Sequence, residues 1–421
     1  MKKLSPYLFF LFSTSFMLQS CVKDRLQTTY TYFVPVYKSK TAVWQSIKSA
    51  PPQALKTTGK LFLYGQYIFI NEVNKGVHII DNVNPLAPKN IAFIAIPGNL
   101  DIAVKNNTLY ADLYTDMVTL DIKDPANVVL KKVTNKVFPE RDYNNGFVPD
   151  SLQYIVGWEK RETRNKNGLD SKLVVQDTFN NFSSAQDSRG AAAGVAGISG
   201  SMARFTIVNN YLYTAGRSFL TTFNITTNVN PVKEHVQTMG WNIETIYPLK
   251  DKLFIGAQTG MFIYSISDPA SPAFLGSFSH ACFNDPVIAD DNYAYVTLRA
   301  STEASFCRGA IALQKNELDI VNISNILQPT LVKLYDMEEP QGLSKDGNLL
   351  FICDGKGGLK IYNAANVMDL KELKVINNIK PFDVICQNGL AIVVAEEGIY
   401  QYDYSNIDNI YQVSKMTIEK N

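Results

Sequence analysis

The sequence has few of the residues on which most catalytic and metal sites depend. Of its 421 residues, only three are histidine and five are cysteine. The histidines His78, His235 and His280 lie far apart along the chain. No H-E-x-x-H, G-x-S-x-G, P-loop or C-x-x-C pattern is present. The sequence therefore predicts no metal site and no cofactor, and it favours a protein that is not an enzyme.

The sequence also lacks an excess of charge of either sign. Lys and Arg number 40 and Asp and Glu 39, so the formal net charge is +1. Loss of residues 1–20 would remove Lys2 and Lys3 and no acidic residue, which changes the net charge to −1. A nearly neutral chain gives no electrostatic reason to expect nucleic-acid binding.

What the sequence does contain is a repeated pattern of short strands. In residues 241–282, apolar runs rich in β-branched and aromatic residues alternate with Gly, Asp and Pro, which is typical of an antiparallel meander. The third run of each repeat closes on a small polar residue. These closing residues are Asp81, Asp121, Asn224, Ser265, Asn322, Asn363 and Asp403. Four of their six separations are 40 or 41 residues, and the other two are longer because of insertions. This period predicts an all-β fold, a single seven-bladed β-propeller of four-stranded antiparallel blades.

A turn rich in Asp, Asn and Pro follows the closing residue in the first five blades, whereas the turns NAANVMDL and DYSNIDNI of blades six and seven lack the Pro. Asp and Asn side chains favour such turns because they accept hydrogen bonds from the backbone two residues on. The segments GVHIIDNVNPLAP and MFIYSISDPASP show it best. They resemble the LVIVD-repeat family of bacterial lipoproteins, and the resemblance covers about residues 54–415. It implies a β-propeller on the cell envelope. It implies no particular biochemical activity.

The first residues read as a targeting segment. Lys2 and Lys3 precede an apolar run that ends at Leu18-Gln19-Ser20-Cys21, which resembles the lipobox of bacterial lipoproteins. We expect residues 1–20 to be a signal peptide and Cys21 to carry a lipid anchor in the membrane. The alternative is an ordinary secretory signal with a chance cysteine. Val22 is not the aspartate associated with inner-membrane retention, so the outer membrane is favoured, on either its periplasmic or its surface side.

Beyond the signal peptide, the expected domains are a tether and lead-in at 21–53 and a propeller at 54–421. Two insertions interrupt the propeller, at 139–200 between blades two and three and at 299–316 within blade five. Strand directions in a meander place both insertions on the face where the innermost strands begin. Loops on a rigid scaffold commonly carry function, so we expect this face to be the functional one. The alternative is that both insertions are decorations without a specific role.

The remaining cysteines divide into a candidate disulfide and two core residues. Cys282 and Cys307 fall on the same face of blade five, and the signal peptide implies an oxidising compartment, so we predict that they form a disulfide. Cys353 and Cys386 fall near opposite faces of the disc and should not bridge. They are interpreted as small core residues.

The first strand of each blade should line the central channel. Polar residues near the start of these strands form a candidate ring at the channel mouth: Lys60, Asp101, Arg204, Glu244, Asp285, Gln341 and Asp383. Such a ring could hold a small ligand or an ion. Alternatively, its mixed charges pair across neighbouring blades.

Two functions fit this sequence. The first is a monomeric, lipid-anchored module that binds an unknown protein or glycan through its loop-rich face. The second is a hydrolase, for example a metal-dependent lactonase, with its site at the channel mouth.

Overall fold

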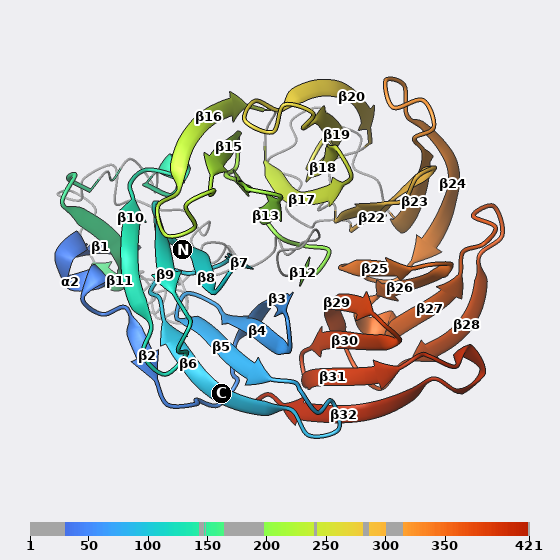
Figure 1. Ribbon diagram of the computed structural model, residues 1–421, viewed down its shortest axis with the longest axis horizontal. Helices are drawn as coiled ribbons and strands as arrows, with labels where there is room; N and C mark the ends of the chain where they lie inside the picture. The colour runs from blue at the N-terminus through green and yellow to red at the C-terminus, as the bar shows by residue number, and fades with distance from the viewer. Residues whose placement is uncertain are drawn as a thin grey trace, which may run out of the picture.

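The computed structural model describes residues 30–142, 147, 149–163, 198–239, 242–280, 286–299 and 315–419. Seven antiparallel sheets stand around a central axis, each containing four consecutive strands, and Figure 1 looks down on this ring. The predicted seven-bladed propeller is therefore confirmed. In every blade the first strand is innermost and the fourth is outermost.

The strands follow one another around the ring in chain order. Blade 1 contains β3 (Thr58–Tyr64), β4 (Tyr67–Glu72), β5 (Gly76–Asp81) and β6 (Lys89–Ala95); blade 2 contains β7 (Ile102–Lys105), β8 (Thr108–Leu113), β9 (Asp116–Asp121) and β10 (Val129–Thr134); and blade 3 contains β13 (Phe205–Val208), β14 (Tyr211–Ala215), β15 (Phe219–Asn224) and β16 (Val232–Thr238). Blade 4 contains β17 (Ile243–Leu249), β18 (Lys252–Ala257), β19 (Gly260–Ser265) and β20 (Ala273–Ser279); and blade 5 contains β21 (Val287–Ala289), β22 (Tyr293–Leu298), β23 (Asn316–Asn322) and β24 (Thr330–Met337). Blade 6 contains β25 (Leu343–Asp346), β26 (Leu349–Cys353), β27 (Leu359–Asn363) and β28 (Lys371–Ile376); and blade 7 contains β29 (Pro381–Gln387), β30 (Leu390–Ala395), β31 (Gly398–Asp403) and β32 (Tyr411–Thr417). Short 3-10 helices occur at Pro139–Asp142, Gly355–Gly357 and Ile407–Asn409.

The repeated turn has the structure that its residues predict. At the end of the third strand of every blade, the closing side chain accepts a hydrogen bond from the N–H two residues on, over 2.8 to 3.2 Å. The local bond reverses the chain between the third and fourth strands without help from distant residues. This explains why so divergent a set of blades shares this one feature.

The disc has two unlike faces. Links from the second to the third strand, such as residues 73–75, share one face with the links between blades, such as residues 96–101; we call it the insertion face. The opposite face carries the repeated turns, such as residues 82–88, and we call it the turn face. Both interruptions fall on links of the insertion face, because one follows β10 and the other separates β22 from β23.

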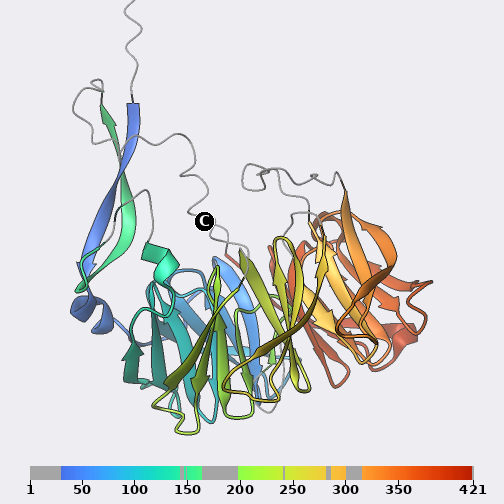
Figure 2. The same cartoon turned by 90° about the horizontal axis from the view of Figure 1, so that it is seen from above.

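The lead-in and the first insertion together build an arm outside the blades. Strand β1 (Tyr30–Ser39) pairs antiparallel with β11 (Gln153–Thr163) over its whole length. Figure 2 shows this two-stranded arm standing away from the insertion face. A short helix, α2 (Lys40–Trp44), follows β1, and β2 (Lys48–Ala50) then extends the outer edge of blade 1. The helix has five residues, and the Ser39 side chain caps its start by accepting a hydrogen bond from the Ala42 N–H.

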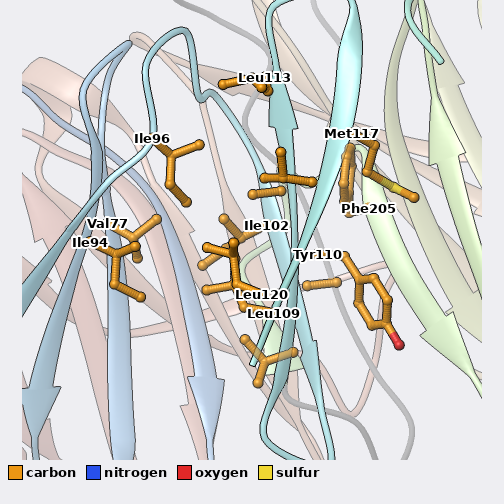
Figure 3. Close-up of a cluster of buried hydrophobic side chains, with 14 of the residues drawn as sticks. Val77, Ile94, Ile96, Ile102, Leu109, Tyr110, Leu113, Met117, Leu120 and Phe205 are labelled. Atoms are coloured by element: carbon orange, nitrogen blue, oxygen red, sulfur yellow. The ribbon is translucent and has the colours of Figure 1, made fainter. Parts of the chain in front are cut away.

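The core lies between blades rather than in one central mass. Figure 3 shows Val77 and Ile94 of blade 1 beside Ile102, Leu109 and Leu120 of blade 2. The same cluster continues into Phe205 of blade 3, and its members are almost fully buried. Each blade therefore covers its apolar faces against its two neighbours, which lets a chain of this length fold without one oversized core.

The ring closes between blade 7 and blade 1 without exchanging a strand. Side chains of blade 7 such as Phe382 pack with Leu61 of blade 1, and Leu55 of the lead-in joins the same cluster. The Glu419 N–H donates to the Leu55 carbonyl over 2.8 Å. The Asn82 and Gln401 amides exchange two hydrogen bonds of 3.0 and 2.7 Å across the seam.

Replacing Gln401 with alanine should weaken this seam. The change leaves the Asn82 amide without both of its bonds across the seam, and such a loss typically costs about 1–3 kcal/mol. We expect a lower urea midpoint for Gln401→Ala. The control is Gln412→Ala in the neighbouring strand β32, whose side chain is exposed and whose removal should leave the midpoint unchanged. Equal midpoints for the two variants would contradict the role given to the amide pair.

Candidate functional site

The central channel is occupied by the protein's own chain. Strand β12 (Ile198–Ser199) pairs antiparallel with β3, the innermost strand of blade 1, and therefore lies inside the ring, as Figure 1 shows. We call residues 198–204 the channel segment. Gly200 to Ala203 are buried. The end of the first insertion thus fills the channel before the chain enters blade 3.

The channel segment touches the inner strands of five blades. Ser201 Oγ accepts a hydrogen bond from the Leu343 N–H of blade 6, and the Ala203 carbonyl accepts one of 2.9 Å from Ile246 of blade 4. The Gly200 N–H donates to Leu61 of blade 1 over 3.0 Å. A Cβ atom at Gly200 would overlap the carboxylate of Asp383 in blade 7. The fifth contact, with blade 2, is made by Arg204.

Lys60, Asp101 and Arg204 of the predicted ring come together at this point. The Lys60 ammonium lies 2.6 Å from Asp101 Oδ2, and the Arg204 N–H donates to the same oxygen. Burial lowers the pKa of Lys60 to about 8 and raises the pKa of Asp101, although each group's attraction for the other opposes its shift. Burial also lowers the pKa of Arg204, and the nearby Arg141 adds to this effect. Asp101 thus connects Lys60 of blade 1 to the end of the channel segment through one buried oxygen.

Of the other ring residues, Glu244 lies close enough to Arg204 for its charge to oppose the lowering of the Arg204 pKa. Glu244 accepts a 3.4 Å hydrogen bond from Gln258 of its own blade. The Gln341 carbonyl accepts a bond of 2.7 Å from Thr297, and its side chain is half-buried. Asp383 is buried against Gly200 and Gly342. Asp285 lies outside the described residues.

A second set of buried or partly buried carboxylates was not identified from the sequence. Glu72, Asp112, Asp354 and Glu397 each lie within two residues of the end of a blade's second strand. Each accepts hydrogen bonds from backbone N–H groups of the segment that leads into the first strand of the same blade. Asp112, for example, binds the N–H groups of Leu100 and Asp101 over 2.8 and 3.0 Å. The signal was present as an acidic residue after the second apolar run, in IFINE, LYAD, LFICD and VVAEE.

The hydrogen bonds of Glu72 predict that the stability of the fold depends on pH. Burial tends to raise the pKa of Glu72, but hydrogen bonds from His78, Thr57, Lys75 and Lys56 outweigh burial and lower it to about 2. A carboxyl whose pKa is depressed on folding stabilises the protein above its unfolded value, near 4.5. That contribution disappears as the pH falls towards 2.

We therefore expect the difference in unfolding free energy between the wild type and Glu72→Gln to be about 2 kcal/mol above pH 5 and to shrink steadily below pH 4.5. Urea unfolding at a series of pH values measures it. Glu372→Gln is the control, since Glu372 is exposed on the outer strand β28. A Glu72→Gln difference that is constant from pH 3 to 7 would contradict the assignment.

A buried cluster holds the arm on the insertion face of blade 2; we call it the latch. Its centre is Asp116, which is fully buried at the start of β9. Asp116 Oδ2 lies 2.7 Å from the Lys40 ammonium and accepts a 2.8 Å hydrogen bond from the Tyr154 hydroxyl. Trp44 Nε1 donates to that hydroxyl over 3.0 Å. The latch thus joins α2, β11 and a blade strand, three segments that are distant in sequence.

Above the latch, the arm exposes apolar and aromatic side chains. Val36 and Tyr37 are each 42% exposed, and Ile155, opposite Tyr37 in the register, is half-buried. Further along, Trp158 lies opposite Pro35 and contacts Phe147, with ring centroids 5.7 Å apart. In the described part of the chain the arm's sheet has two strands, so its outer edges have no strand partner there.

Several predicted residues lie outside the described residues, namely Cys21, Cys282 and Cys307. Cys353 and Cys386 are free thiols, as predicted. Cys353 is fully buried in the core between blades 6 and 7, and Cys386 packs against that core. Burial raises the pKa of both thiols, which keeps them protonated and unreactive.

The described residues also bear on metal binding and on membrane insertion. Within those ranges no three His, Cys, Asp or Glu side chains gather in a way that could hold a metal ion. Among the helices described, none combines the length and the apolar character needed to cross a membrane. His78 is fully buried beside Glu72, and His235 contacts Gln237.

Comparison with known proteins identifies the repeat. Residues 57–91, 253–280 and 310–337 match the LVIVD repeat, and they fall in blades 1, 4 and 5. No curated protein sequence matches the chain significantly.

Solved structures resemble the chain in fold. A protein from Lactobacillus plantarum has 10% identity and a TM-score of 0.51, with coverage of 86% of this chain and 97% of the other. Sqt1 from Saccharomyces cerevisiae has 8% identity and a TM-score of 0.50, with coverage of 91% and 88%. PorZ, a bacterial surface component of the type-IX secretion system of Porphyromonas gingivalis, has 14% identity and a TM-score of 0.47, with coverage of 88% and 39%. Likeness at these identities concerns the fold alone. The chain is therefore a seven-bladed β-propeller that carries LVIVD repeats in blades 1, 4 and 5.

Proposed function

We propose that this protein is a lipid-anchored module of the cell envelope that binds a protein partner through its arm and insertion face. The lipid would be attached at Cys21, and the outer membrane is the favoured location. The observation that carries the proposal is the arm. It belongs to no blade, yet the buried latch fixes it at one place on the disc.

The arm has the properties of a protein-binding element. Tyr37 and Ile155 lie opposite each other and so share one face of the arm, where Tyr37 is 42% exposed, and aromatic side chains are enriched where proteins meet. The edges of a two-stranded ribbon present backbone N–H and C=O groups that an added strand can pair with. This second property favours a protein over a glycan, because only a polypeptide offers a matching row of backbone groups.

The channel mouth supports the alternative of a hydrolase less well. Asp101 accepts hydrogen bonds from the Lys60 ammonium and from the backbone N–H of Arg204, and Ser201 binds the backbone of blade 6. These polar groups are used in holding the channel segment, so a substrate would have to displace it.

Cross-linking in cells tests the proposal. A photo-reactive phenylalanine at position 37 should capture one discrete partner in the membrane fraction of cells that make the protein. The matched control is the same probe at Tyr411, a tyrosine of similar exposure, 49%, on the outer strand of blade 7. Equal cross-linking at the two positions, or none at position 37, would reject the arm as the binding element.

A further inference from the structure

The chain runs along β1 from the free tip of the arm towards the disc. Strand β1 begins with Tyr30, which pairs with Thr163 at the free end of the arm, and it reaches the disc only at Ser39. The latch begins at the next residue, Lys40. The N-terminal end of the described chain therefore lies at the tip of the arm, and Figure 2 shows this tip as the part of β1 farthest from the disc.

We infer that the arm is a spacer that holds the propeller with its insertion face towards the membrane. This inference rests on the proposed lipid at Cys21, and it adds which surface the membrane meets. Eight residues lie between Cys21 and Tyr30, so nine Cα-to-Cα steps connect the two. Fully extended, they reach about 32 Å from the tip of the arm.

That reach is too short for the opposite orientation. To bring the turn face against the membrane, the tether would have to run back along β1, a length of about 33 Å for its ten residues. It would then have to pass the depth of the disc, about 20 Å for a six-residue strand such as β19. The sum, about 53 Å, exceeds the tether's reach by roughly 20 Å.

The limit on the tether's reach applies only if the arm is fixed to the disc. The latch supplies the fixed point, because Asp116 binds Lys40 of the lead-in and Tyr154 of β11 from inside the fold. The exposed apolar residues of the repeated turns, such as Leu86, Leu327 and Met368, then point away from the membrane. A partner that reaches the insertion face would accordingly be a protein of the same membrane.

Fluorescence resonance energy transfer from the protein to the membrane tests the orientation of the propeller. Thr259 on the insertion face and Ser271 on the turn face are exposed residues at opposite ends of blade 4. Each is changed to cysteine in a background that carries Cys282→Ser and Cys307→Ser, and each is labelled with a donor dye. The full lipidated protein is reconstituted in phosphatidylcholine vesicles that carry a headgroup-linked acceptor. We expect clearly higher transfer from position 259 than from position 271.

Three results bear on the inference. In the lipidated protein, equal transfer from the two positions, or higher transfer from position 271, would overturn it and leave the anchor in place. Mass spectrometry that finds no lipid on Cys21 would overturn the anchor and the inference together. With the Asp116→Ala change added, the difference between the positions should shrink, because the spacer is no longer fixed to the disc.

Discussion

Substitution of Gly200 by valine is expected to destabilise the propeller by about 3 kcal/mol, because overpacking a buried site typically costs 1–3 kcal/mol and this site cannot relax. A side chain there would overlap the Asp383 carboxylate. Gly342 of blade 6 also lies close to Asp383, so the carboxylate is confined by two backbone segments. The channel segment would have to leave the inner strands, and its bonds to Leu61, Leu343 and Ile246 would be lost.

Urea unfolding of Gly200→Val measures this effect. The control is the same substitution at a glycine that has free space around it. Gly157 in β11 has no atom within 4 Å of the place a Cβ would take. Gly157→Val should therefore unfold like the wild type. If both variants have the wild-type midpoint, the channel segment does not support the ring. We also expect new protease cleavage near residue 200 in Gly200→Val alone.

Removal of the Asp116 carboxylate should have the second large effect. In Asp116→Ala the Lys40 ammonium, which is only 11% exposed, loses its counter-ion, and the Tyr154 hydroxyl loses its acceptor. The Lys136 N–H also loses its 2.9 Å bond to Oδ1. Breaking a buried ion pair by removing one partner costs about 3–5 kcal/mol. Part of this should appear as release of the arm, because the latch joins separate segments.

Limited proteolysis separates arm release from loss of the whole fold. We expect early cleavage of Asp116→Ala within residues 30–50, while the blades resist for longer. The control is Asp336→Ala in β24. The Asp336 side chain is 67% exposed and pairs with Lys315 over 3.1 Å, and a surface pair of this kind contributes at most about 1 kcal/mol. Simultaneous cleavage of arm and blades would show that the latch belongs to the global fold.

The number of blades and the positions of their turns could be predicted from the sequence alone. The closing residues from Asp81 to Asp403 mark local turns whose hydrogen bonds span two residues, so each could be read without knowledge of the rest. The alternation of short apolar runs with turns then determined the number of blades, because each blade is made of consecutive strands. Cys353 and Cys386 were placed correctly for the same reason, since strand direction is a local property.

Only the tertiary structure decided what fills the channel and where the arm stands. Nothing near Gly200 in the sequence indicates that it lies against Asp383, more than 180 residues later. The pairing of β1 with β11, and the meeting of Lys40, Tyr154 and Asp116, likewise join segments that lack the 40-residue period. These contacts depend on the closed ring, which brings distant residues together only after the blades have packed. Periodicity therefore identified the scaffold, whereas the channel segment and the arm follow from long-range packing that no local pattern encodes.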